Sequence, residues 1–250
     1  MNRDGRFDRL ELLLGEAALK RLQQASVAVF GLGGVGSHAV EALVRGGVGH
    51  LTLVDFDSID ISNSNRQIHA TVETIGQPKA AVMAQRCRSI NPQVKVDAHQ
   101  ALYNAETADE LLGGEYDYVL DCIDQITAKL HLIQSCLERG LPIISSMGAA
   151  NKVDPTQIEM ADLSKTRHCR LARIMRKELR RRGISKGVKT VYSTEEFHPL
   201  TEGRRPLEAP ADGQQYQQQR APLGSSSVIP PLFGLTMAGE VLRSLSEEKG

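Results

Sequence analysis

The stretch VFGLGGVGSHAV, residues 29–40, decides the fold, because it places a glycine-rich turn between a short apolar run and a helix. Its glycines follow the spacing G-x-G-x-x-G and are Gly31, Gly33, Gly34 and Gly36. Glycine lets the backbone turn tightly and approach a phosphate, while the N–H groups that begin the next helix face the anion. The turn therefore predicts a phosphate-binding site and by itself leaves ATP and a nicotinamide dinucleotide both open.

The sequence on both sides of this turn predicts alternating strands and helices. Strands are expected at 27–30, 50–55, 94–96, 116–122 and 141–146, and helices at 37–45, 80–90 and 128–139. Leucines at helical spacing predict one more helix over residues 8–24. This alternation is typical of an α/β fold with a Rossmann-like, doubly wound, mostly parallel sheet.

After residue 146 the pattern changes. We expect residues 1–150 to form the nucleotide-binding core, with 1–25 as an N-terminal helical segment, and residues 151–250 to be the C-terminal part of the same domain. Residues 165–189 are dense in lysine and arginine, and Leu171, Ile174, Met175 and Leu179 predict an amphipathic basic helix that ends at Gly183.

Two further segments complete the chain. Residues 202–227 are rich in Pro, Gly, Gln and Ser and predict a mobile loop. Residues 228–242 are apolar, but Pro230, Pro231 and Glu240 interrupt them, and the run is too short to cross a bilayer. We expect a buried C-terminal segment and no membrane partner.

Composition excludes several classes of protein. Thirty basic and thirty acidic residues cancel, so overall charge selects no partner. The cysteines Cys87, Cys122, Cys136 and Cys169 lie far apart with no C-x-x-C pair, which argues against a structural zinc site. The N-terminus lacks the apolar run of a signal peptide, so we expect a cytoplasmic protein with free thiols.

Polar residues after the second strand favour ATP with Mg²⁺ over a redox dinucleotide. The stretch DFDSIDISNSNRQ, residues 55–67, supplies carboxylates for a metal, amides for orientation and an arginine for phosphate charge. A lysine in GQPKA and two aspartates in DCID belong to the same edge of the sheet. The expected ATP-binding residues, besides the glycines, are Asp55, Asp57, Asn63, Asn65, Arg66, Gln67, Lys79 and Asp121.

In this order and spacing, GLGGVGS, VDFDSIDISNSNRQ, GQPK and DCID resemble the ATP-dependent activating enzymes related to the ubiquitin-activating E1 enzymes, including the bacterial MoeB and ThiF proteins. The resemblance covers about residues 6–150. It implies that a carboxylate attacks the α-phosphate of ATP to give an acyl-adenylate and pyrophosphate.

The resemblance also implies roles for individual residues. Asp55 would bind the ribose, Asn65, Arg66 and Lys79 the phosphates, and Asp124 the Mg²⁺ ion. A homodimer is implied as well, in which Arg9 of the segment RFDR, residues 6–9, enters the site of the neighbouring subunit. The expected catalytic residues are Arg66, Asp124 and, in trans, Arg9.

The basic helix indicates which carboxylate is activated. Its cations stand out in a chain of zero net charge, which favours contact with the phosphates of a nucleic acid. The expected contacts are Arg170, Arg173, Arg176, Lys177, Arg180, Arg181 and Arg182.

The later segments ADLSKT, ARIMRKELRRRGI, VYSTE and PLGSSSVIPPLFGLTMAGEV extend a resemblance to the tRNA threonylcarbamoyladenosine dehydratases over nearly the whole chain. That resemblance implies ATP-dependent dehydration of threonylcarbamoyladenosine in tRNA to its cyclic form, with a cysteine desulfurase and its sulfur acceptor as further partners. Members of that family often have Asp-Pro where this chain has Cys169-Arg170, and some have a cysteine where it has Thr190. The resemblance therefore does not carry a cysteine-dependent step over to this chain.

Three other functions stay open from the residues alone. Adenylation of the C-terminus of a ubiquitin-like sulfur carrier would use every ATP residue named above. An NAD-dependent oxidoreductase would use the glycine turn and Asp55, but this function leaves the presence of Arg66, Lys79 and Asp124 unexplained. A tRNA-binding protein regulated by ATP would bind nucleotide without releasing pyrophosphate.

Overall fold

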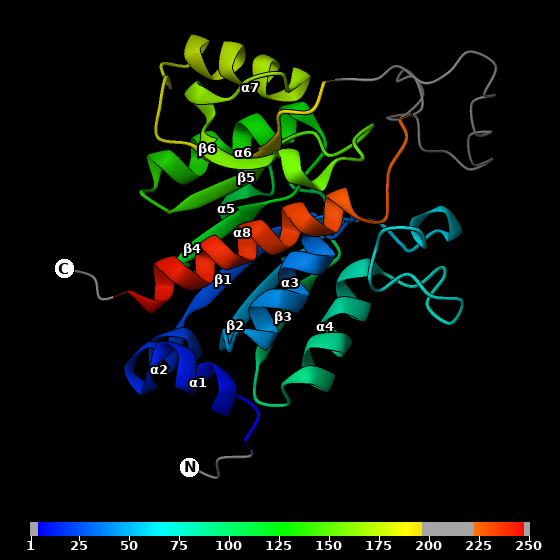
Figure 1. The fold of residues 1–250 in the computed structure, drawn as a ribbon, viewed down its shortest axis with the longest axis vertical. Coiled ribbons are helices and arrows are strands. Elements are labelled where there is room, and N and C mark those ends of the chain that lie inside the picture. The colour runs from blue at the N-terminus through cyan, green and yellow to red at the C-terminus, as the bar shows by residue number, and fades with distance from the viewer. Residues whose placement is uncertain (1–4, 197–222, 248–250) are drawn as a thin grey trace.

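Within the described residues, 5–196 and 223–247 of a computed structural model, seven strands form one sheet in the order β3-β2-β1-β4-β5-β7-β6 (Figure 1). Their bounds are β1 Ser26–Phe30, β2 His50–Val54, β3 Lys95–His99, β4 Tyr118–Asp121, β5 Ile143–Ser146, β6 Ile158–Asp162 and β7 Lys189–Ser193. Every pairing is parallel except that of β6 with β7. The predicted mostly parallel sheet is confirmed.

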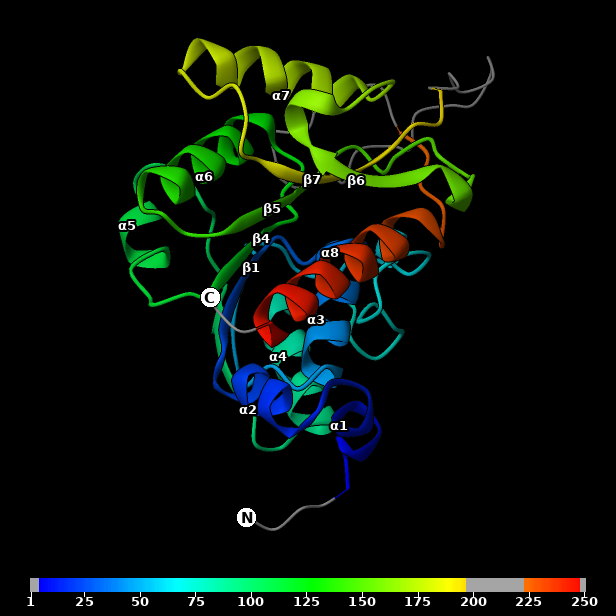
Figure 2. The ribbon, with the colours of Figure 1, turned by 60° about the vertical axis from the view of Figure 1, so that its left-hand side comes forward.

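Helices cover both faces of the sheet (Figure 2). One face carries α3 Gly36–Arg45, α4 Lys79–Ile90 and α8 Ile229–Ser246, and the other carries α5 Ala108–Leu111, α6 Ile126–Glu138 and α7 Arg170–Arg181. The chain begins with α1 Asp8–Leu14 and α2 Glu16–Gln24, and the short 3-10 turns are η1 Ile61–Asn63, η2 Pro155–Gln157 and η3 Leu163–Lys165.

The central strand β1 shows why its sequence is continuously apolar. Val27 and Val29 belong to the core beneath α3 and α8, whereas Ala28 and Phe30 belong to the core beneath α6. Alternate side chains of a strand point to opposite faces, so a strand covered on both faces needs apolar residues throughout.

The strand order reverses at β1, and for an open α/β sheet this predicts a ligand-binding crevice, called the crevice below, at the carboxyl ends of β1 and β4. The chain passes from β1 to β2 on one side, and β4 pairs with β1 on the other. Ligands of open α/β sheets bind at the carboxyl ends of the strands where the order reverses in this way. The glycine turn after β1 and residues 122–125 after β4 both lie at this point.

Residues from the second part of the chain complete the same sheet and core. β7 pairs with β5, and Phe233, Met237 and Val241 of α8 are fully buried in the core that α3 shares. The predicted buried C-terminal segment is confirmed. No helix among the described residues has the length and apolar character needed to cross a bilayer.

Three expectations were wrong or fall outside the structure. Residues 8–24 form two helices, because the backbone breaks at Gly15 with a φ of 85°, and this leaves Leu12 and Leu13 exposed. On α7, Ala172 is buried in place of Ile174, which is 40% exposed. Most of the predicted mobile loop, residues 202–222, lies outside the described residues.

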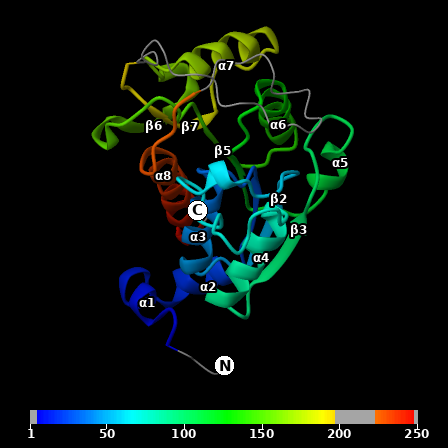
Figure 3. The ribbon, with the colours of Figure 1, turned by 90° about the vertical axis from the view of Figure 1, so that its right-hand side faces the viewer.

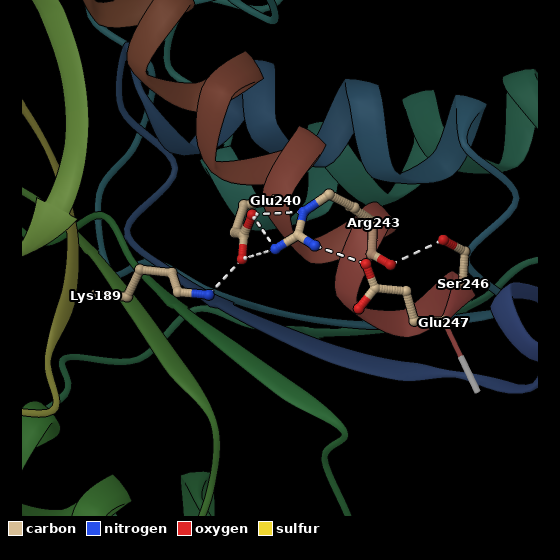
Figure 4. A network of polar contacts seen from close by, with 5 residues as sticks. All are labelled: Lys189, Glu240, Arg243, Ser246 and Glu247. Atoms are coloured by element: carbon tan, nitrogen blue, oxygen red, sulfur yellow. Dashed lines mark hydrogen bonds and ion pairs between the residues drawn. The ribbon is translucent and has the colours of Figure 1, made fainter. Parts of the chain in front are cut away.

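A buried carboxylate joins α8 to β7 (Figure 4). Glu240 is only 4% exposed, pairs with Lys189, and accepts hydrogen bonds from Arg243 at 2.9 to 3.1 Å. Burial by itself would raise the pKa of Glu240, but the hydrogen bonds from Lys189 and Arg243 outweigh it and the pKa is lowered. Because this pKa is lower than the ordinary value, ionisation of Glu240 stabilises the folded state.

We predict that Glu240→Gln lowers the free energy of unfolding by about 2 kcal/mol at neutral pH, because charge-assisted hydrogen bonds are lost. The lowered pKa means that this contribution is present above the ordinary glutamate value of 4.5 and disappears as pH falls through the folded pKa. Urea unfolding at neutral and at acidic pH measures this contribution of Glu240 to the free energy of unfolding. Glu247→Gln, at an exposed partner of Arg243, should cost less than about 0.5 kcal/mol. Equal effects of the two substitutions would contradict the account.

Candidate functional site

The glycine turn is fixed tightly against the end of β4. Gly31 has a φ of 88°, and a Cβ there would lie 2.8 Å from the carbonyl oxygen of Cys122. A Cβ on Gly36 would lie 1.8 Å from the carbonyl oxygen of Gly31. These two glycines are required by the fold, and they bring the first turn of α3 to the crevice.

The middle glycines of the turn differ from each other. Gly34 lies close to Pro230 and Arg66. A Cβ on Gly34 would be 3.0 Å from Cβ of Pro230 and 3.1 Å from Cγ of Arg66. A Cβ on Gly33 would find nothing closer than the amide nitrogen of Gln67 at 3.9 Å. Gly33 is therefore not required by packing within the described chain, and its lack of a side chain leaves room for a ligand.

Asp55 lies at the end of β2 and contacts the same turn. Its carboxylate accepts hydrogen bonds from the N–H of Leu32 at 2.6 Å and from the N–H of Asp57 at 2.8 Å. Burial raises its pKa, and the positive charge of Lys79 opposes that change. Each carboxylate oxygen can accept more than one hydrogen bond, so a ribose hydroxyl can still bind.

A folded-back loop brings Lys79 to the site from the start of α4. Ser58 and Pro78 form a β-bridge, and the N–H of Ile59 donates to Gln77 at 2.9 Å. This pairing places the ammonium of Lys79 2.8 Å from the carboxylate of Asp57. The lysine side chain is only 6% exposed, and its charge is near enough to Asp55 to oppose the rise in the pKa of that carboxyl group.

Asn63 has a structural task in this loop. Its side-chain oxygen accepts the N–H of Asp60 at 3.2 Å, while the Asp60 carboxylate accepts the N–H of Ser62 at 2.8 Å. This reciprocal cap shapes η1. Only the amide nitrogen of Asn63 could therefore meet a phosphate in the way expected from the sequence.

Arg66 is held in place by a chain of hydrogen bonds. Its guanidinium donates to the side-chain oxygen of Asn65 at 2.8 Å and to the carbonyl of Ser62 at 2.9 Å. Asn65 in turn donates to the carbonyl of Ser225, just before α8, at 2.9 Å. Partial burial lowers the pKa of Arg66 and the nearby Asp124 carboxylate opposes this, but the guanidinium remains charged.

Gln67 and His69 carry the buried side-chain polar atoms that lack a hydrogen-bond partner among the described residues. They are Oε1 of Gln67 and both ring nitrogens of His69. Burial lowers the pKa of His69 to about 4, so its ring is neutral at physiological pH. The amide nitrogen of Gln67 would lie 3.9 Å from a Cβ on Gly33, so Gln67 lies beside the glycine turn.

The two aspartates of DCID have different surroundings. Asp124 is exposed, makes no hydrogen bond within the described residues and is attracted to Arg66. Asp121 is fully buried, and its carboxylate is occupied by Lys129 at 2.7 Å and by the hydroxyl of Ser145 at 2.6 Å. The expectation that Asp121 contacts ATP does not fit this geometry.

Sequence reasoning missed Lys129 and Ser145. A lysine in the apolar run ITAKLHLI was the available signal, since a cation with apolar neighbours on its helix face suggests a buried partner.

The sequence model of the ThiF family matches residues 7–250. The chain belongs to the ThiF family. It is 43% identical over 242 residues to the tRNA threonylcarbamoyladenosine dehydratase of Bacillus subtilis, across 97% of this chain and 95% of that protein. The crystal structure of the Escherichia coli enzyme in complex with ATP matches with a TM-score of 0.85 at 34% identity, covering 96% of this chain and 93% of that chain.

Other ThiF-family relatives match a shorter part of the chain. The molybdopterin-synthase adenylyltransferase of Salmonella typhimurium is 36% identical over 140 residues, which cover 56% of this chain and 54% of that protein. The match to the Bacillus subtilis dehydratase thus includes the basic helix and the C-terminal helix, whereas this one covers only about half of the chain.

The basic helix of this ThiF-family chain exposes all of its expected cations except Arg176, although two of the exposed ones are paired with other side chains. Arg176 is turned inward and donates to Thr166 and, at 3.5 Å, to the carbonyl of Leu163, so it holds η3. Arg181 pairs with Glu178, and Arg182 donates to Gln134 at 3.1 Å. The remaining expected contacts are exposed and are Arg170, Arg173, Lys177 and Arg180.

Arg9 lies far from the crevice of its own chain. It belongs to α1, which precedes α2 and β1, whereas the glycine turn follows β1 (Figure 1). The segment between β2 and α4, cyan in Figures 1 and 3, lies away from α1 in both views. Arg9 is exposed.

The cysteines of this chain do not resemble nucleophiles. Burial raises the pKa of Cys87 and of Cys136 to about 12 and also raises that of Cys122. Cys169 is buried and accepts the N–H of Ala172 at 3.5 Å at the start of α7. Among the described residues, no group of three or more His, Cys, Asp or Glu could hold a metal ion.

We predict that Gly33→Ala keeps the fold and weakens ATP binding at least tenfold, because the added methyl occupies space that no protein atom fills. Gly31→Ala should instead destabilise the protein, because its φ is positive and its Cβ would meet backbone. Thermal unfolding and ATP titration by calorimetry separate the two effects. Unchanged ATP affinity in folded Gly33→Ala would show that the turn does not hold a phosphate.

Proposed function

We propose that this chain is an ATP-dependent tRNA threonylcarbamoyladenosine dehydratase. The observation that carries the proposal is the extent of the similarity. The Bacillus subtilis dehydratase matches 97% of the chain, α7 and α8 included, whereas the molybdopterin-synthase adenylyltransferase matches 56%. The exposed cations of α7 supply the nucleic-acid surface that such a substrate requires and that a small carrier protein does not.

In the proposed reaction the threonyl carboxylate of the modified adenosine attacks the α-phosphorus of ATP. A bond forms between a carboxylate oxygen and phosphorus, and the bond to pyrophosphate breaks. The carbamoyl group then attacks the activated carbonyl carbon, a proton is released, and AMP leaves with the former carboxylate oxygen. The tRNA loses one water while ATP becomes AMP and pyrophosphate.

The residues at the crevice fit this chemistry, in which the protein positions reactants and stabilises charge. Asp55 binds the ribose, the glycine turn frames the phosphates, and Arg66 and Lys79 supply positive charge. Lys79 has three donors, so it can keep Asp57 as a partner while contacting a phosphate. Gln67 and the amide nitrogen of Asn63 add donors beside them.

Asp124 is the residue that would hold Mg²⁺. Magnesium usually binds one or two carboxylates together with substrate phosphates and water, so it needs no cluster of protein ligands. An exposed carboxylate next to Arg66 and without a hydrogen bond fits that requirement. The ion would neutralise charge on the phosphates and on the leaving pyrophosphate.

The tRNA surface consists of the exposed cations Arg170, Arg173, Lys177 and Arg180. A Cβ added to Gly148, just after β5, would lie 3.6 Å from Cβ of Leu171. The start of α7 is therefore next to the end of β5. β5 pairs with β4, and Asp124 lies in the segment that follows β4. Phosphates bound along α7 would therefore lead toward the adenylating edge.

The proposal includes a homodimer in which Arg9 acts in trans. Arg9 sits on α1 beside the exposed Leu12 and Leu13, and the crossover segment near ATP exposes Ile61 and Val72. A two-fold dimer that buries these apolar groups against each other places α1 of each subunit at the other's crevice. Arg9 would then stabilise charge on the transferring phosphate.

A cysteine desulfurase and its sulfur acceptor stay part of the proposal as partners, with a cytoplasmic location. Since burial raises the pKa of the Cys87, Cys122 and Cys136 thiols, and Cys169 is buried, such partners would bind without passing sulfur to this chain.

Pyrophosphate release from ATP and Mg²⁺ tests the function, measured with tRNA carrying threonylcarbamoyladenosine, with unmodified tRNA and without tRNA. We expect release only with the modified tRNA, and a nucleoside product lighter by one water. Arg66→Ala should abolish release and leave tRNA binding intact. Release with a ubiquitin-like carrier protein and with none of the tRNAs would instead establish the sulfur-carrier function.

Reversing three cations on one face of α7 tests the tRNA surface. In Arg173→Glu, Lys177→Glu and Arg180→Glu combined, the slope of log affinity against log salt should fall by about three units, because each phosphate contact contributes roughly one. Filter binding over a salt series measures it. Lys20→Glu with Lys95→Glu, exposed and distant from α7, is the control. An equal loss in the control would move the tRNA surface elsewhere.

A further inference from the structure

The buried charges at the end of β4 have no direct part in the proposed reaction. Lys129 and Asp121 are both 0% exposed, and the ammonium lies 2.7 Å from the carboxylate. Ser145 of β5 donates to the same carboxylate oxygen at 2.6 Å and lies 3.2 Å from the ammonium. α6 and two neighbouring strands therefore meet at one polar contact in an otherwise apolar core.

Stability alone does not explain this contact. Removing two charges from water is costly, and well-packed apolar residues often serve a buried position as well or better. Burial raises the pKa of Asp121 even though Lys129 opposes it, so burial disfavours the charged form of this carboxylate. A geometric role is the remaining reason to place a charge pair here.

The pair fixes residues 122–125, the segment between β4 and α6. The second carboxylate oxygen of Asp121 accepts the N–H of Ile123 at 3.2 Å, and the ammonium of Lys129 also lies 3.4 Å from the carbonyl of Asp121. At the other end, the N–H of Lys129 donates to the carbonyl of Gln125 at 3.0 Å. Asp124 lies between these two attachments.

The same segment supports the glycine turn. The N–H of Cys122 donates to the carbonyl of Phe30 at 2.8 Å, and the carbonyl of Cys122 is the group that excludes a side chain at Gly31. A shift of residues 122–125 would therefore move both the carboxylate of Asp124 and the support of the phosphate-binding turn.

We propose that Asp121, Lys129 and Ser145 are positioning residues that hold Asp124 in the orientation in which it meets Mg²⁺ and ATP. The proposal rests on the proposed function and deepens it. None of the three side chains touches the substrates. Asp121 thus acts on the site through the backbone of residues 122–125.

Ser145→Ala is the first test, because it removes one hydrogen bond of the contact and leaves the ion pair. We expect the Mg²⁺ concentration for half-maximal pyrophosphate release to rise about tenfold, as for other groups that orient a metal ligand. The rate at saturating Mg²⁺ should change less. In an Asp124→Asn background the same substitution should add no further change, because the carboxylate it orients is gone.

Lys129→Met is the stronger variant, since it leaves Asp121 buried without its partner. Circular dichroism checks whether it folds. If it folds, its half-saturating Mg²⁺ concentration should exceed that of Ser145→Ala, and a smaller effect would contradict the proposal. If Lys129→Met does not fold, the Mg²⁺ dependence of Ser145→Ala alone tests the positioning role.

Glu240→Gln is the matched control, because Glu240 is also a buried carboxylate in ion pairs, on the α8 side of the sheet. It should lower stability without changing the Mg²⁺ dependence. Equal shifts in Ser145→Ala and Glu240→Gln, or no shift in Ser145→Ala while the unmodified protein is active, would overturn the positioning role alone. No release by the unmodified protein under any condition would overturn the proposed function and this role with it.

Discussion

The close approach of the glycine turn to the end of β4 is the constraint on which the site depends. The carbonyl of Cys122 leaves no space for a side chain at Gly31, and the carbonyl of Gly31 leaves none at Gly36. Because both contacts involve backbone, they cannot relax by a change of rotamer. They direct the start of α3 toward the crevice and bring residues 122–125 beside it, so the phosphate-binding turn and the Asp124 carboxylate are set together.

The segment between β2 and α4 forms the other wall. Asp55 holds the turn through the N–H of Leu32, and the loop that follows carries Lys79 back to Asp57. Arg66 extends this wall to the last part of the chain, because Asn65 joins its guanidinium to the carbonyl of Ser225. The residues before α8 therefore contribute to the geometry of a site whose motifs all lie in the first half of the sequence.

Much of this arrangement could be predicted from the sequence. Apolar runs that alternate with amphipathic segments identified the parallel strands up to β5, and the motifs at their ends identified the crevice. β6 and β7 were missed although they are as long as β1 to β3, because polar and charged residues interrupt their apolar pattern, which reads IEMAD in β6 and KTVYS in β7. Asp121 was assigned to ATP because position at a strand end does not reveal which way a side chain points. Lys129 was missed because a buried charge and an exposed charge look the same in a sequence. The inward turn of Arg176 depends on Thr166, ten residues earlier in the chain, which helical spacing alone does not show.

The transfer of an oxygen atom tests the central claim most directly. The threonyl carboxylate of the modified tRNA is labelled with a heavy oxygen isotope, the protein is given ATP and Mg²⁺, and AMP and pyrophosphate are analysed by mass spectrometry. If the carboxylate is adenylated, its oxygen leaves with AMP, so we expect the label in AMP and none in pyrophosphate. Unlabelled AMP together with cyclised nucleoside would contradict adenylation of the carboxylate and with it the roles assigned to Arg66, Lys79 and Asp124.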